Sequence, residues 1–143
     1  MNRVYRLLDR VIGWHAVVAW LAVIFALSSI PNNFGATEDT LPVDKAVHAI
    51  EFGVLAFLVT WLGLRATIAH HDAPLTAAVA VGAVLFALAY GVIDEAHQRF
   101  VPGRDPSWAD FGADAAGAVA GAPAAIALRR RTATEKIDSE TAS

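Results

Sequence analysis

The chain has 143 residues, of which 56% are hydrophobic and only 17% are charged. Soluble domains contain roughly 45 to 50% apolar residues, so this composition predicts an all-α membrane protein. A net charge of -3 with scattered Lys and Arg residues argues against a nucleic-acid partner, because binding a polyanion requires a basic surface. The absence of cysteine excludes disulfides, thiolate metal sites and cysteine nucleophiles.

Four apolar segments are candidates for crossing a membrane. The first has His15 as its only strongly polar side chain and stops before Pro31. A signal peptide is the alternative for this segment, but its apolar run is long for a signal and three more candidates follow it. The fourth has the lowest hydropathy because it consists mostly of Ala and Gly. The four predicted spans are residues 11–30, 46–64, 75–93 and 109–128.

The charges between these spans predict their orientation. Only Lys45, Arg99 and Arg104 fall on one side of a four-span arrangement. The other side receives Arg3, Arg6, Arg10, Arg65, Arg129, Arg130, Arg131 and Lys136. The positive-inside rule therefore places both termini in the cytoplasm. We expect a four-helix transmembrane bundle within residues 1–131, followed by a polar and disordered tail of residues 132–143.

Polar residues gather at one end of three spans. The predicted orientation places these ends on the outer side of the membrane. On the second span, Asp44, His48 and Glu51 are spaced by four and three residues, so they share one helix face. On the third span, the same rule groups Asp94, Glu95 and Gln98, if that helix continues past Ile93. On the fourth span, it groups Asp110, Asp114, Gly117 and Gly121.

Ionisable side chains beside hydrocarbon are costly, so this set predicts a functional site. Glu51 and Asp114 lie more than a turn inside their spans and require a partner or a water-filled cavity. His48 is one candidate partner, and Arg104 is a candidate clamp for a carboxylate. The alternative is structural pairing or anchoring at the headgroups. For the GxxxG motif of Gly117 and Gly121, close helix packing is the favoured interpretation.

The residue types are compatible with acid–base chemistry. The candidate catalytic acids and bases are His48, Glu51, Asp94 and Glu95. The candidate substrate-binding residues are Asp44, Lys45, Gln98, Arg104, Asp110 and Asp114. No cofactor is evident, but these side chains include suitable ligands for a divalent cation. The sequence contains no nucleophile elbow, Walker loop or dinucleotide motif. It is therefore compatible with an enzyme and with a non-enzymatic protein.

Two stretches of the sequence, residues 44–58 and 90–121, together resemble the VanZ-like family of bacterial membrane proteins. The similarity lies in a DKxxHxxxF opening, a YGxxDExxQxFxPGR centre and a DxxxNxxGxxxG close. Asp114 stands where the family usually has Asn, which replaces a neutral amide with an acid. The matching residues are Asp44, Lys45, His48, Phe52, Tyr90, Gly91, Asp94, Glu95, Gln98, Phe100, Pro102, Gly103, Arg104, Asp110, Gly117 and Gly121.

The resemblance implies a four-span protein of the bacterial cytoplasmic membrane, whose namesake is linked to low-level resistance to the glycopeptide teicoplanin. It implies no known reaction. We expect an outward-facing site that binds or processes a membrane lipid or a lipid-linked cell-wall precursor. One alternative is a non-enzymatic module whose polar cluster is structural. Another is a small proton-coupled transporter, which would have to form a homo-oligomer.

Overall fold

The computed structural model describes residues 7, 9–31, 42–66 and 73–141. Within these ranges the secondary structure is helical and contains no strand, which confirms the all-α prediction. The named helices are α2 (Trp14–Ser28), α3 (Pro42–Ala66), α4 (Ala73–Gln98) and α5 (Trp108–Thr141).

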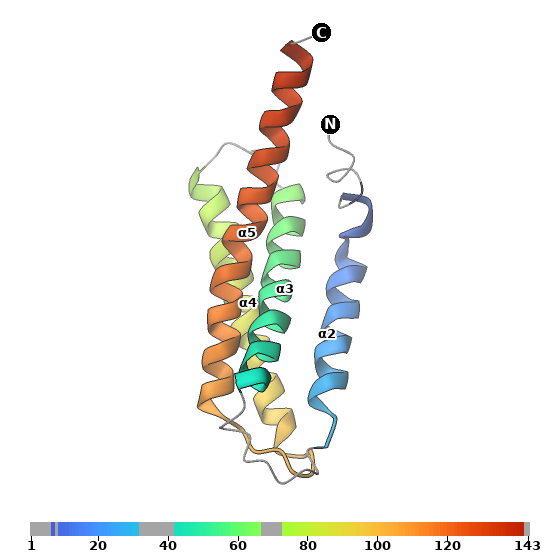
Figure 1. Cartoon of the computed structure of the whole chain (residues 1–143), viewed down its shortest axis with the longest axis vertical. Coiled ribbons are helices and arrows are strands. Elements are labelled where there is room, and N and C mark those ends of the chain that lie inside the picture. The colour runs from blue at the N-terminus through green and yellow to red at the C-terminus, as the bar shows by residue number, and fades with distance from the viewer. Residues whose placement is uncertain (1–6, 8, 32–41, 67–72, 142–143) are drawn as a thin grey trace.

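The helices alternate in direction along the chain (Figure 1). α2 and α4 finish at the end of the bundle where α3 and α5 begin, and we call this the polar end. α3 and α5 therefore run parallel to each other. Their contact is the most extensive in the structure, α4 packs against both, and α2 contacts α3 and α4 less extensively. The described residues thus form a three-helix core with α2 beside it.

Three helical segments are long and apolar enough to cross a membrane: Val43–Ala66, Ala73–Gln98 and Trp108–Arg131. They correspond to the predicted second, third and fourth spans. α4 continues past Ile93 as far as Gln98 because no Gly or Pro interrupts this stretch. The continuation carries Asp94 and Glu95 on a regular helix, which fixes the spacing of their side chains.

The predicted first span, residues 11–30, is shorter in the structure. α2 has 15 residues, which at 1.5 Å per residue gives about 22 Å, whereas the hydrocarbon core of a bilayer is roughly 30 Å thick. The helix begins after Gly13, whose backbone is extended, and its C-cap is Ser29, close to Pro31. The described residues therefore show three helices of spanning length, and α2 is a shorter apolar helix.

The last helix extends further than the sequence predicts. α5 continues to Thr141, into the segment of residues 132–143 for which the polar composition predicts disorder. No Gly or Pro follows Pro123 in this helix. Extending an existing helix is much easier than starting one, and Ala, Arg, Glu and Lys in this segment favour a helix.

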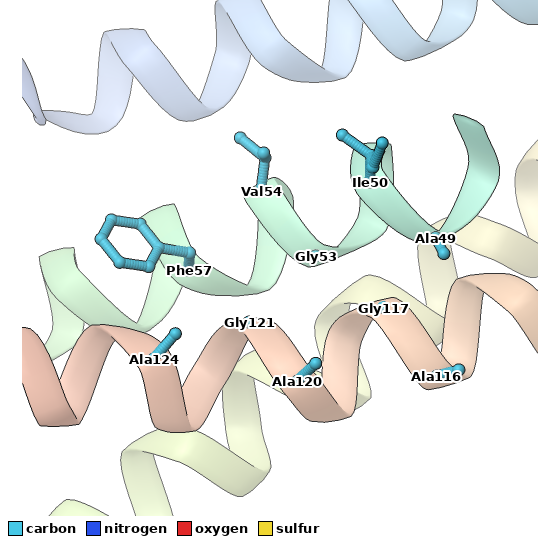
Figure 2. A pocket seen from close by; sticks show the side chains of 10 residues that line it. All are labelled: Ala49, Ile50, Gly53, Val54, Phe57, Ala116, Gly117, Ala120, Gly121 and Ala124. Atoms are coloured by element: carbon cyan, nitrogen blue, oxygen red, sulfur yellow. The ribbon is translucent and has the colours of Figure 1, made fainter. Parts of the chain in front are cut away.

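Two glycines allow α5 to lie directly against α3. A Cβ atom on Gly117 would overlap the backbone carbonyl of Ala49, and one on Gly121 would overlap the carbonyl of Gly53. Figure 2 shows both glycines on the edge of α5 that faces α3. Both overlaps involve backbone atoms, so no side-chain rotation relieves them. The contact brings the first turns of α5 beside the first turns of α3.

At the opposite end of the bundle, Asp9 connects the segment before α2 to α3 and α5. Its carboxylate accepts a hydrogen bond from Trp61 Nε1 (3.1 Å) and lies 4.0 Å from Arg129 Nη1. Arg129 also donates to the Trp61 carbonyl and lies over the Trp61 ring, 5.0 Å from its centroid. Arg65 donates to the backbone carbonyls of Asp9 and Ile12. The sequence analysis treats these arginines only as loop charges.

We expect Gly117→Ala and Gly121→Ala to lower the melting temperature of the purified protein in detergent, as followed by circular dichroism. α5 has to move away from α3 to admit the new methyl group, and overpacking of this kind typically costs about 1–3 kcal/mol. Gly112→Ala is the matched control, since nothing lies within 4 Å of its Cβ position. It should melt at the original temperature or higher, because Ala favours a helix. Equal losses in all three variants would contradict this account.

Candidate functional site

Side chains from three helices converge at the polar end. His48, Glu51, Asp94, Gln98, Asp110 and Asp114 are buried, while Asp44, Lys45 and Glu95 are partly buried. All nine are among the residues that the sequence analysis predicts as site residues. We call these nine residues the polar cluster.

Two contacts join α3 to α5 within the polar cluster. Lys45 Nζ forms an ion pair with Asp110, whose side chain is only 1% exposed. His48 Nδ1 lies 3.0 Å from Asp114 Oδ1, and both side chains are buried. Because the two helices are parallel, residues three or four apart on each helix form successive pairs. Gly91 on α4 leaves room for the second pair, since a Cβ there would lie 3.0 Å from Asp114 Oδ2.

A separate set of hydrogen bonds joins α2 to α4. Asp94 Oδ2 accepts hydrogen bonds from Ser28 Oγ (2.9 Å) and from Gln98 Nε2 (3.0 Å). Ser29 Oγ lies 2.9 Å from His97 Nε2. The two serines and His97 are not among the residues that the sequence predicts for the site. Their only signal is a pair of hydroxyl groups at the end of an apolar run.

The loop between α4 and α5 contacts the polar cluster through Glu95. Gly103 has a φ of 77°, which glycine adopts readily, and it lies in a turn with Pro102. Glu95 Oε2 then accepts a hydrogen bond from the Ser107 backbone amide (2.7 Å), just before α5 begins. Arg104 donates from Nε to the Ile30 carbonyl (3.3 Å), so this arginine also connects the loop to the end of α2.

Several oxygens of the polar cluster are buried without a hydrogen-bond partner among the described residues. They are Asp44 Oδ2, Glu51 Oε1, Glu95 Oε1, Gln98 Oε1 and Asp114 Oδ2. Leaving a buried acceptor unsatisfied costs about 1–3 kcal/mol, and more when it carries a charge. Their concentration at one place indicates a site for a ligand that carries hydrogen-bond donors or positive charge.

The polar cluster also contains two sets of three residues that could hold a metal ion. One set is Asp44, His48 and Asp110, and the other is His48, Glu95 and Asp114. In each set the ligand atoms lie within 4.8 Å of one another. Imidazole and carboxylate groups are common ligands of transition metals.

Gly117 and Gly121 lie outside the polar cluster, at the contact between α3 and α5. An open groove beside this contact is lined only by apolar side chains and glycines (Figure 2). The lining residues are Ala49, Ile50, Gly53, Val54, Phe57, Ala116, Gly117, Ala120, Gly121 and Ala124. The groove therefore offers no side-chain group for acid–base or metal chemistry.

A family model described as VanZ/LLP1 matches residues 10–129. The chain belongs to the VanZ/LLP1 family. The match covers α2, α3, α4, the first part of α5 and every residue of the polar cluster, which confirms the resemblance seen in the sequence motifs. Comparisons with curated proteins and with solved structures gave no match.

We expect Asp94→Ala to destabilise the protein, because Ser28 Oγ and Gln98 Nε2 would both lose their acceptor. Each buried group left without a partner costs about 1–3 kcal/mol. Asp94→Asn keeps one carbonyl oxygen and should lose less. The measurement is thermal unfolding in detergent, with Asp105→Ala at an exposed position as the control. If Asp94→Ala melted at the temperature of the original protein, the hydrogen bonds of Asp94 between α2 and α4 would not contribute to its thermal stability.

Proposed function

We propose that this VanZ-family protein binds, at the polar cluster, the phosphate-bearing headgroup of a membrane lipid or of a lipid-linked cell-wall precursor. The observation that carries the proposal is the group of buried carboxylate oxygens without a hydrogen-bond donor at the polar end of the bundle. Lys45 and Arg104 are partly exposed and suit an anionic phosphate. The carboxylates suit the hydroxyl and amino groups of a sugar or peptide portion.

The proposal places the protein in the bacterial cytoplasmic membrane with both termini in the cytoplasm and the polar end facing outwards. The distribution of cations supports this orientation. Arg65 and Arg129 lie at one end of the bundle, whereas Lys45 and Arg104 lie at the other. In this arrangement α2 also crosses the membrane, which gives four crossings in total. The helical residues 9–11 before Gly13 lengthen the crossing segment that contains α2.

Processing of the bound headgroup is the finer part of the proposal. His48 with Glu51 or Glu95 would handle protons, since these side chains lie close enough to interact electrostatically. Asp114 would orient the imidazole, as a buried carboxylate does for a general base. Asp94 already accepts two hydrogen bonds and is better suited to positioning the helices.

The alternative is a non-enzymatic module in which the polar cluster only holds the helices together and a partner docks on the protein. The interhelical contacts favour this alternative, because Lys45 and His48 join α3 to α5 and Asp94 joins α4 to α2. Under it, Glu95→Gln would be tolerated, because the amide still has an oxygen that accepts the Ser107 bond. Losses of function would then follow the amount of protein in the membrane.

We expect the purified protein in detergent to bind farnesyl pyrophosphate and phosphatidic acid more tightly than phosphatidylcholine, as measured by native mass spectrometry. Lys45→Ala and Arg104→Ala should each weaken binding about tenfold or more, since a hydrogen bond to a charged group contributes about 1.5–3 kcal/mol. Arg99→Ala removes an exposed arginine in the same region and is the matched control. An equal effect of all three substitutions, or no preference for the two lipids with a terminal phosphate over phosphatidylcholine, would refute the proposed binding.

A cellular assay separates the two candidate functions. We expect His48→Ala, Glu95→Gln and Arg104→Ala to abolish any effect of the gene on teicoplanin susceptibility or envelope stress while membrane levels stay unchanged. Full function of Glu95→Gln, together with losses that follow protein abundance, would instead support the structural module. Membrane levels are measured by immunoblotting in the same cells.

A further inference from the structure

We propose that His48, Glu95 and Asp114 bind a divalent transition-metal ion, such as Zn²⁺ or Mn²⁺, inside the polar cluster. The three side chains come from α3, α4 and α5, and one ligand atom of each lies within 4.8 Å of the other two. Ligand atoms around such an ion are separated by roughly 3–3.6 Å, because metal–ligand bonds are about 2.0–2.2 Å long. Small side-chain rotations are therefore sufficient to bring all three onto one ion.

Unpartnered oxygens point independently to an ion at this place. Asp114 is fully buried, and its Oδ1 faces His48 while its Oδ2 has no hydrogen-bond partner. Glu95 likewise uses Oε2 for the Ser107 amide and leaves Oε1 buried without a partner. Each carboxylate thus has one oxygen that positions it and a second oxygen available to a ligand. A Cβ at Gly91 would lie 3.0 Å from Asp114 Oδ2, so the glycine avoids a close contact with this oxygen from α4.

The distribution of charge favours this set of three residues over the other. In the set of Asp44, His48 and Asp110, the Asp110 carboxylate is already paired with the Lys45 ammonium, which would repel a second cation. Among the described residues, neither Glu95 nor Asp114 forms an ion pair with a lysine or arginine. A dication beside them would offset two buried negative charges at once.

The donor types select the class of metal. One imidazole nitrogen with two carboxylate oxygens suits Zn²⁺ or Mn²⁺, whereas Ca²⁺ prefers six to eight oxygen ligands. Asp114 offers a carboxylate, whose negative charge strengthens metal binding relative to a neutral amide. Three protein ligands also leave a coordination position open. The inference deepens the proposed function, and rests on it only for the role of the ion, which would be to hold a phosphate oxygen.

The metal content of the tag-free protein in detergent tests the site without any lipid. After incubation with Zn²⁺, Mn²⁺ or Ca²⁺ and desalting, inductively coupled plasma mass spectrometry should find about one Zn²⁺ or Mn²⁺ per chain and no retained Ca²⁺. Glu95→Gln and Asp114→Asn should lower the affinity at least tenfold in a chelator competition. Asp105→Asn, at an exposed position outside the polar cluster, is the matched control and should leave the affinity unchanged. The metal should also raise the melting temperature of the original protein but not that of Glu95→Gln.

Retention of the metal by both Glu95→Gln and Asp114→Asn, or an equal loss in Asp105→Asn, would overturn the assignment. Absence of Zn²⁺ and Mn²⁺ from the original protein would overturn it as well. Farnesyl pyrophosphate binding is then compared with and without EDTA. Binding that persists in EDTA would remove the ion from the proposed function while leaving that function intact. Metal binding without any lipid binding would support the ion site and refute the proposed binding of a lipid headgroup.

Discussion

The close approach of α3 and α5 is the contact on which the rest of the structure depends. Gly117 and Gly121 let the two backbones touch at Ala49 and Gly53, where any Cβ would collide with a carbonyl. In a membrane, such packing replaces the hydrophobic effect as the main attraction between helices, because lipid chains are as apolar as the side chains themselves. The same approach brings the first turns of the two parallel helices within reach of each other's polar side chains.

The polar end shows the consequence of placing carboxylates in apolar surroundings. An ionised group removed from water requires a partner, and breaking a buried pair is far more costly than never having formed it. Asp110 is paired with Lys45, Asp114 with His48 and Asp94 with a hydroxyl and an amide. These pairs use only part of the acceptor capacity of the polar cluster. The oxygens left over give the site its chemical character, which is acidic inside and cationic at the edge.

Membership of the VanZ/LLP1 family and the geometry of the site contribute different kinds of information. The family match covers residues 10–129 and establishes what kind of protein this is. The geometry shows that the polar motif residues of three helices meet at one place. A fold alone does not imply a function, so headgroup and metal binding are inferred from particular atoms of Glu95, Asp114 and Lys45.

The sequence by itself determined the helical class, the family and the residues of the polar cluster, and three of its four predicted spans are helices of spanning length. It did so because apolar runs identify spans and steps of three and four identify a shared helix face. Tertiary structure alone decided the partners: Ser28 for Asp94, His48 for Asp114, and Asp9 for Trp61 and Arg129. It also decided that α2 ends short of a full span and that α5 runs on to Thr141. Spacing along one helix fixes which side chains point the same way, whereas their partners depend on the rotation and distance between helices, which backbone contacts such as that at Gly117 set.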